Sequence, residues 1–568
     1  MMADTDHLAL RSHELGALPI IDHFLGRLGV MPALERYLAP GDRRLRLPAA
    51  TALRVLVTNL VIHKEPVYAL GEWAGVFDPS LLGLSAEEIA LLNDDRLGRA
   101  LDRLFDADRA SLVTELVVGA IDNFAIDCSQ LHNDSTTVTF SGDYRFANGQ
   151  PRGGKPTPAI VHGHNKDYRP DLKQLLWILT ISADGAVPIA FRVADGNTED
   201  SPTHIPTWDT LVAITGDPSF LYVADCKLAS REAMDHIAGR GGRFLTVLPK
   251  GRKEETFFRE WLQTHTPTWS EVLRRPGARH GEPDEVWRST PSPIPSAEGY
   301  RIVWIWSSSK AQADAQWRQT RIEAGCAALE SVHARVTGPK TRFHDRVAVE
   351  DAAARAIAAA KADRWVGFEV TETLEETFTK TTRGERTNAA TYRRSTRKKF
   401  TVTPRVDAAA VAYDAKADGC FPLITNDTTL SAADLLAAHK YQPNLEKRHA
   451  QLKGTQLVAP VFLKSPARIE ALLLCHFIAL LTQTLIEREI RQAMATEQAG
   501  ALPLYPEDRA CRTPTAARVL EIFSGLARHH LIEEGQTLRT FQPELSALQH
   551  EVLGLLGISP AAYTGATS

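Results

Sequence analysis

Short β-type runs dominate residues 126–250, and this pattern constrains the fold of the chain more than any other feature. The five runs are "LHNDSTTVTF", "LLWILTISA", "VPIAFRV", "FLYVAD" and "RFLTVLPK". Helices are expected near 202–214 and 229–239, ahead of the fourth and fifth runs. Strands that alternate with helices in this way build an α/β layer with a mixed sheet. The sequence therefore predicts an α/β fold.

The segments on either side of these runs have a different character. Apolar residues at helical spacing, punctuated by prolines, predict a helical N-terminal domain. Strand candidates further along surround two alanine-rich helical stretches, near 310–336 and 349–362, and a serine-capped helix is expected from about Ser431. The predicted parts are a helical N-terminal domain (1–125), a mixed-sheet core in two parts (126–250 and 418–490), a β-rich, mixed insertion between them (251–417) and a helical C-terminal region (491–568).

The composition excludes several classes of protein. The chain of 568 residues is 44% hydrophobic and 24% charged, which is ordinary for a soluble globular protein. Its formal net charge of −4 confines any nucleic-acid site to a local patch. Its six cysteines form no CxxC pair, which argues against a zinc site or a disulfide framework and suits a reducing cytoplasm.

Neither a signal peptide nor a membrane span is expected. The opening segment "MMADTDHLALRSHELG" carries acids and has no apolar core. The most apolar segment, from Ile469, contains Glu470, His476 and Gln483, which membrane spans tolerate poorly. We therefore expect a buried helix there, and a cytoplasmic protein without a membrane partner.

Two aspartates stand out in the β-type runs. Asp134 lies inside the first run, where a charge costs free energy unless something compensates it. Asp225 ends the fourth run, at the strand edge where α/β sheets place their ligands, although an aspartate there also caps helices. If the two strands are neighbours, their negative charges face each other and favour a cation between them.

A third acid lies far down the chain, in "YQPNLEKRHAQLKG". Glu446 precedes Lys453 by about two helical turns, so both lie on one face of a helix, which could equally be a solvated, charged face. Three carboxylates suit two Mg²⁺ ions, which activate a water or a DNA 3′-hydroxyl in phosphoryl transfer. Mn²⁺ is expected to substitute, and no cysteine or histidine cluster offers a zinc alternative.

Four stretches together resemble a family. They are "NDSTTVTFSGD", "GHNKDYRPDLKQLLWIL", "YVADCKLAS" and "GCFPLITNDTTL…YQPNLEKRHAQLKG…PVFLKSPARIEALLL". Their order resembles that of DDE transposases of bacterial insertion sequences, in the branch with a β-rich insertion before the catalytic glutamate. The opening "LGALPIIDHFLGRLGV" is similar to that of the same proteins. The resemblance implies a ribonuclease H-like core in which Asp134, Asp225 and Glu446 are the catalytic, metal-binding triad.

The chain departs from this family at one motif. Relatives in this branch often carry a tyrosine seven residues before the glutamate, an arginine four before it and a lysine seven after it. Here these positions hold His439, Gln442 and Lys453, so only the lysine carries over. Tyr441 is displaced from the tyrosine position, and Arg448 is expected to supply the missing charge.

Positively charged segments provide candidates for DNA contacts. The run 378–400 holds eight Lys or Arg and one acid, and 166–174 is a charged connector close to Asp134 in the sequence. A solvated loop and a plain connector are the alternatives, whereas neutralisation of DNA phosphates is the functional interpretation. The predicted DNA-binding residues are Lys453, Arg448, Lys447, Tyr441, Lys166, Arg169, Arg393, Arg394, Arg397, Lys398 and Lys399.

These observations predict a transposase that binds terminal inverted repeats and target DNA and catalyses Mg²⁺-dependent cleavage and strand transfer. A homodimer assembled on double-stranded DNA is expected. Two alternatives remain open: a non-catalytic DNA-binding regulator derived from a transposase, and a nuclease of the same fold that does not join strands.

Overall fold

The computed structural model describes residues 8–39, 46–277, 279, 281–381, 391–455, 463–533 and 536–565. The chain divides into two compact units. The first unit comprises Met1–Thr246 and Ala437–Ser568, and the second comprises Val247–Leu436.

A five-stranded mixed sheet forms the centre of the first unit, in the order β4-β3-β2-β5-β6. The first three strands pair antiparallel, whereas β5 pairs parallel with both β2 and β6. This is a ribonuclease H-like arrangement, as the sequence predicted. The strands are β2 (Gln130–Phe140), β3 (Lys173–Ser182), β4 (Pro188–Asp195), β5 (Leu221–Ala224) and β6 (Arg243–Val247).

Helices α8 (His204–Thr215) and α9 (Arg231–Gly239) connect the last three strands of this sheet. The α9 helix begins where the Ser230 hydroxyl accepts a hydrogen bond from the backbone N–H of Ala233, the usual role of an N-cap serine. Trp208 of α8 is fully buried. These helices appear where the sequence placed them, because their apolar spacing and caps agree with their tertiary packing.

A long helix, α16 (Pro466–Thr496), packs on the sheet and on the N-terminal helices. Phe477 of α16 stacks on Phe191 of β4, which stacks in turn on Trp177 of β3. Helices α3 and α6 also pack against α16. The N-terminal helices are α1 (Leu18–Arg27), α2 (Val30–Tyr37), α3 (Ala49–Ile62), α4 (Leu70–Ala74), α5 (Ala86–Ile89), α6 (Asp94–Asp106) and α7 (Arg109–Phe124).

By length and composition alone, α16 is the one helix in the described part of the chain that could cross a membrane. Its most apolar window, however, is 94% buried inside the protein. This is the placement of a core helix, as the polar residues within the segment indicated.

The terminal regions contain strands that the sequence did not suggest. β1 (Leu8–Glu14) pairs antiparallel with β15 (Ala527–Glu533), which also pairs with β16 (Gln536–Phe541). β13 (Leu502–Tyr505) and β14 (Arg509–Cys511) form a further small sheet. The expectation that 491–568 is helical is therefore correct only in part: α17 (Ala516–Glu521), α18 (Ala547–Leu555) and α19 (Ala561–Thr564) alternate with these strands. The pairing of β1 with β15 joins segments from opposite ends of the chain, so local sequence patterns do not reveal it.

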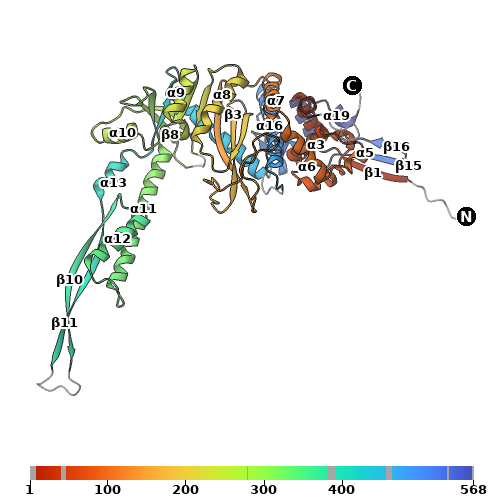
Figure 1. The fold of residues 1–568 in the computed structure, drawn as a ribbon. Coiled ribbons are helices and arrows are strands. Elements are labelled where there is room, and N and C mark those ends of the chain that lie inside the picture. Colours follow the sequence, from red (N-terminus) through yellow and green to blue (C-terminus); the bar gives the residue numbers. More distant parts are fainter. Residues whose placement is uncertain are drawn as a thin grey trace. The chain divides into compact units, whose positions relative to one another are not determined.

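The second unit contains a four-stranded antiparallel sheet, β12-β9-β8-β7, and a separate two-stranded ribbon, β10-β11 (Figure 1). β12, from the segment expected to rejoin the core, pairs here with β9. The strands are β7 (Ser270–Arg275), β8 (Glu285–Pro291), β9 (Arg301–Ser307), β10 (Val366–Lys380), β11 (Tyr392–Val406) and β12 (Cys420–Thr425). The helices are α10 (Lys253–Thr264), α11 (Ser308–Thr337), α12 (Arg346–Ala359) and α13 (Ala408–Ala415).

Helices α11 and α12 form a small hydrophobic core with the base of the ribbon. Leu329 of α11 and Val349 of α12 are fully buried there, against Val370 of β10 and Phe400 and Val402 of β11. The two helices match the alanine-rich stretches identified in the sequence, since alanine favours helix and allows close packing.

Candidate active site

Asp134 lies in the middle of β2, the central strand of the first unit's sheet. One carboxylate oxygen accepts the backbone N–H of Ser135 at 2.8 Å, and the side chain is 25% exposed. The pKa of Asp134 is raised to about 6 by burial, with a smaller contribution from the charges of Asp225 and Asp200, whereas the ammonium group of Lys166 acts in the opposite direction. The protein therefore holds this carboxylate at a cost in free energy.

Asp225 follows β5 directly and lies near Asp134. The parallel pairing of β2 with β5 sets Asn133 beside Ala224. Asp134 and Asp225 are the residues that follow this pair, so they lie next to each other on adjacent strands. Asp225 accepts the backbone N–H of Lys227 at 3.0 Å and begins a short 3₁₀ turn. Although the residue is exposed, loss of solvation raises the pKa of Asp225, and the charge of Asp200 adds to this effect. Neighbouring strands thus bring two of the predicted acids together.

Asp200 is a third acid at this position, and the sequence analysis missed it. It lies in the segment between β4 and α8 and accepts a hydrogen bond from the Ser135 hydroxyl. Its charge raises the pKa of both Asp134 and Asp225. The segment "DGNTEDSPT" has no strand or helix periodicity. An acid directly ahead of a helical segment was the one available signal, and that is also the signature of an ordinary cap.

Lys166 is the cation that faces these acids. Its ammonium group lies 3.7 Å from Asp134 and 3.3 Å from Asp200, and it donates to the backbone carbonyl (2.7 Å) and the hydroxyl (2.6 Å) of Ser135. One lysine therefore offsets part of the charge of three clustered aspartates.

Helix α15 (Pro443–Ala450) packs over β2 and carries the third predicted acid. Gln442, just before the helix, accepts a hydrogen bond from His132 Nδ1 at 2.9 Å and donates to the carbonyl of Asn133 at 3.2 Å. His449 lies with Nδ1 4.0 Å from the Asp134 carboxylate. Glu446 is solvent exposed and, at four residues after Gln442 and three before His449, shares the face that both use. Glu446 thus lies on the helix that packs over the acid-bearing strand, but within the described residues no hydrogen bond, ion pair or electrostatic coupling joins it to Asp134 or Asp225.

His449 is neutral in this environment. It is buried, and burial lowers its pKa to about 3, with the charges of Lys166 and Lys453 acting in the same direction. Its Nε2 atom has no hydrogen-bond partner within the described ranges. The histidine therefore adds no positive charge beside Asp134.

The predicted DNA-contact residues near the site differ in their availability. Lys453 forms an ion pair with Asp167, at 2.6 Å and 2.8 Å, and Arg169 forms an exposed pair with Asp171 at 2.7 Å. Lys447 is exposed and donates to the side chain of Asn444 at 3.3 Å. All three cations remain at or near the surface.

Arg448 and Tyr441 lie deeper than the sequence suggested. Arg448 is 6% exposed, forms an ion pair with Glu487 at 2.7 Å and donates to the carbonyls of Gly185 and Ala186. A DNA contact by Arg448 would have to break these bonds. Tyr441 is half-buried with its ring centroid 4.9 Å from that of His132, and burial raises the pKa of its hydroxyl.

The predicted basic run lies on β11, opposite an acidic β10. Cross-strand ion pairs join Arg394 to Glu376, Lys398 to Glu372 at 2.7 Å and Lys399 to Glu375 at 2.8 Å. Within the described residues, Arg393 and Arg397 are exposed and have no carboxylate partner. The part of the run between 382 and 390 lies outside the described residues. The available positive charge is thus smaller than the sequence indicated.

The carboxylates have the chemistry to bind a divalent cation, but their side chains are not arranged around a common point. No group of three or more His, Cys, Asp or Glu side chains in the described part of the chain is arranged to hold a metal. Asp134, Asp200 and Asp225 offer the hard oxygen donors that Mg²⁺ prefers, and each raises the electrostatic cost of another. A divalent cation would relieve this repulsion more fully than the single ammonium group of Lys166.

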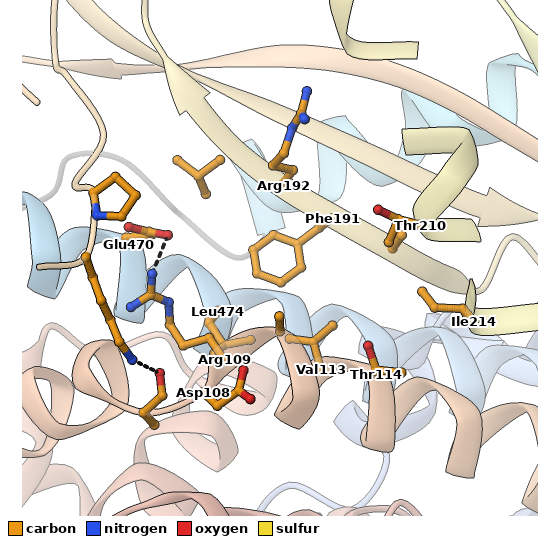
Figure 2. Close-up of a pocket in the computed structure, with 16 residues that line it drawn as sticks. Asp108, Arg109, Val113, Thr114, Phe191, Arg192, Thr210, Ile214, Glu470 and Leu474 are labelled. Carbon is orange, nitrogen blue, oxygen red and sulfur yellow. Dashed lines mark hydrogen bonds and ion pairs between the residues drawn. The ribbon is translucent and has the colours of Figure 1, made fainter. Parts of the chain in front are cut away.

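A separate cavity lies on the other side of the sheet's edge strand. It measures about 540 Å³ and is lined by α7, β4, α8 and α16, with Phe191 and Arg192 on one wall (Figure 2). Arg109 and Glu470 pair across it at 3.1 Å. None of Asp134, Asp225 and Glu446 lines this cavity. It therefore plays no part in the candidate active site.

A family model described as a domain of unknown function, DUF4277, matches residues 10–118. No curated protein matches the chain.

Among solved structures, a piggyBac transposase synaptic complex with hairpin DNA is 12% identical, with a TM-score of 0.25 and coverage of 61% of this chain and 72% of that one. A Mos1 transposase paired-end complex with the left transposon end is 11% identical, with a TM-score of 0.14 and coverage of 36% of this chain and 60% of that one. Likenesses this low carry no conclusion about the activity of this chain.

Proposed function

We propose that the chain is a transposase that binds terminal inverted repeats and catalyses metal-dependent DNA cleavage and strand transfer. The observation that carries the proposal is the electrostatic coupling of Asp134 and Asp225 on adjacent strands of a ribonuclease H-like sheet. The helix that bears Glu446 packs over the same strand. Clustered acids with raised pKa values are typical of catalytic sites.

The proposed roles follow from the position of each residue. Asp134, Asp225 and Glu446 would hold Mg²⁺ or Mn²⁺, with Asp200 as a further acidic neighbour. The bound ions would activate a water or a DNA 3′-hydroxyl and stabilise the leaving oxygen. Gln442 anchors the helix on β2, and Glu446 on that helix would turn toward Asp134 to share a metal ion.

Of the two basic side chains next to Asp134, Lys166 would carry a positive charge and His449 would not. Lys166 holds Asp134 and Asp200 together while no divalent cation is bound, since its ammonium group lies within 4 Å of both. His449 stays neutral because it is buried. A divalent cation would then displace only the ammonium group of Lys166 to reach the carboxylate oxygens.

DNA would be held by cations that remain accessible. Lys447, Lys453 and Arg169 lie on elements next to the acids, and Arg393 and Arg397 extend from the ribbon of the second unit. Neutralisation of phosphates by such residues supplies affinity without sequence specificity. Two copies of the chain would act together on the paired ends.

The test is an end-cleavage assay on duplexes carrying the inverted repeats that flank the gene. The wild-type chain should cleave at the repeat ends with Mg²⁺ or Mn²⁺. Asp134→Asn should bind the same duplexes without cleaving them, because it lacks a metal-binding charge. Asp122→Asn is the matched control, since Asp122 is an exposed acid on α7 whose charge does not contribute to the pKa shifts of Asp134 and Asp225. Wild-type cleavage by Asp134→Asn, or no cleavage by any of the proteins, would contradict the proposal.

A further inference from the structure

The ribbon β10-β11 has two chemically distinct faces. In an antiparallel pair, residues opposite each other lie on the same face, and every second residue along a strand returns to it. Val370 pairs with Val402 and Glu372 with Phe400, so even-numbered residues of both strands share one face. We call it the even face. The other, odd face carries the ion pairs Glu375–Lys399 and Glu369–Arg405, together with Arg393, Arg397, several threonines and a serine.

An apolar row runs along the even face, interleaved with the charged side chains of Glu372, Glu376, Arg394 and Lys398, and it is covered only at its base. Near the base, Val366, Val370, Phe400 and Val402 are buried against α11 and α12. Further out, Leu374, Phe378 and Tyr392 continue the same row and are 65%, 62% and 58% exposed. The row thus passes from a packed core into solvent without a change in side-chain character.

An uncovered ribbon of this kind is unusual. A two-stranded hairpin is marginally stable in water unless another element packs on its apolar face. Exposed apolar residues that line up on one face, rather than lying scattered, mark an interaction surface. Within the described residues of the second unit, no element packs against Leu374, Phe378 or Tyr392.

We propose that the outer half of the even face packs against the same face of a second copy of this chain. The charges on this face support self-association. β10 contributes Glu372 and Glu376, whereas β11 contributes Arg394 and Lys398. A two-fold axis that runs along the ribbon lays β10 of one copy over β11 of the other, so that acids face bases. A two-fold axis across the ribbon would lay acids over acids, which is destabilising.

DNA fits the even face less well than a second copy does. Glu372 and Glu376 on this face repel phosphates and already pair with Arg394 and Lys398, whereas a second copy brings acids and bases in equal number and leaves these pairs in place. The cations without carboxylate partners, Arg393 and Arg397, lie on the odd face. The ribbon therefore separates its two contacts: the odd face suits a phosphate backbone, and the even face suits protein.

The contact is small. Three exposed side chains per copy bury far less than the roughly 1,200–2,000 Å² of a stable interface, so free chains should associate only weakly. The contact goes beyond the proposed DNA cleavage, and neither its formation nor its test involves the acids of the first unit. A failed cleavage assay would leave it standing.

Photo-crosslinking of the full-length chain detects such a weak contact. The photoreactive residue p-benzoylphenylalanine is placed at Phe378 on the even face or, as a matched control, at the adjacent Thr379 on the odd face. Irradiation at high protein concentration without DNA should give a covalent dimer from the Phe378 probe, with about tenfold lower yield from the Thr379 probe. Equal yields from the two probes, or monomer alone from both, would overturn the proposal.

A second arm guards against damage to the ribbon by the probe at Phe378. With the probe at Tyr392, the dimer should form in the otherwise wild-type chain and in Thr373→Ser, and should be largely absent in Leu374→Ser. Addition of a short duplex identifies the competing occupant. Crosslinks from Phe378 and Tyr392 to DNA in place of a second chain would assign the even face to DNA and overturn the proposal.

Discussion

The first unit's sheet brings like charges together, whereas the second unit's ribbon pairs opposite charges. On the sheet, Asp134, Asp200 and Asp225 crowd together, and the ammonium group of Lys166, joined at Asp225 by that of Lys227, offsets only part of their charge. On the ribbon, most charges are exposed and matched across the strands. Like charges under partial burial cost free energy, whereas exposed pairs contribute little either way.

This difference separates functional charge from structural charge. A cluster of acids that lowers the stability of the protein is typical of a functional site, for example one that binds a cation. A matched set of exposed pairs needs no such explanation, because it keeps a ribbon soluble. The ribbon residues that break its pattern, Arg393 and Arg397, are for the same reason its best candidates for contact with DNA.

The largest expected effect breaks the acid cluster. Asp134→Asn and Glu446→Gln should each lower the cleavage rate by ~10³-fold or more, as is found for catalytic groups that act as a unit. The double variant should cost little more than either single one. Single-turnover cleavage kinetics measure this. Multiplicative losses in the double variant would mean that the two acids act independently.

The next effect concerns stability and pH in the absence of divalent metal. The pKa of Asp134 is about 6 in the folded protein against an ordinary value of 3.8. Between these values the folded state keeps a proton that the unfolded state has lost, so stability falls as pH rises toward 6 and stays low above it. Asp134→Asn removes this contribution, which is at most about 3 kcal/mol.

Denaturant unfolding in EDTA, from pH 4.5 to 7.5, measures this effect as the difference between wild type and Asp134→Asn. The variant should gain stability relative to wild type as pH rises, and other titrating groups cancel in the comparison. Parallel stability curves for the two proteins would show that Asp134 is not held in a repulsive environment.

A smaller effect tests the ribbon's unpaired cations. Arg393→Ala with Arg397→Ala should lower the slope of log affinity for DNA against log salt by about 0.9 for each phosphate that the variant no longer neutralises. The control, Glu376→Gln with Arg394→Gln, removes one whole ion pair and should leave the slope unchanged. Salt titrations by fluorescence anisotropy measure both. Equal changes in both variants would mean that pairing does not decide which cations reach DNA.

The smallest expected effect concerns the stability that the ribbon's pairs provide. Lys399→Ala removes an exposed partner of Glu375 and should lower the free energy of unfolding by less than about 1 kcal/mol, because solvent screens such pairs. Thermal unfolding checks this. A much larger loss would show that the ribbon's charges are structural elements in their own right.

The fold of the sheet was predictable because local signals agreed there with tertiary packing. The runs that became β2 to β6 are rich in β-branched and aromatic residues, and caps such as Ser230 mark the helices between them. The strand β1 was not predictable, because its partner β15 lies at the opposite end of the chain. Pairing between distant segments leaves no local trace in the sequence.

The site was predictable only where the chemistry coincided with an element. Asp134 stood out as a charge within a strand, and Asp225 as an acid at the end of one. Asp200 lies in an irregular segment and shows its importance only through its neighbours. Arg448 suggested a DNA contact, but Glu487, on a different helix, holds it in the interior.

The central claim is that the crowded acids bind a divalent cation, and Mn²⁺ titration by isothermal calorimetry tests it most directly. The account predicts that wild type and the control Asp122→Asn bind Mn²⁺ alike. Asp134→Asn, Asp225→Asn and Glu446→Gln should each lose most of that binding while remaining folded, with thermal unfolding at least as high in temperature as that of the metal-free wild type. Unchanged Mn²⁺ binding in all three variants would contradict the account.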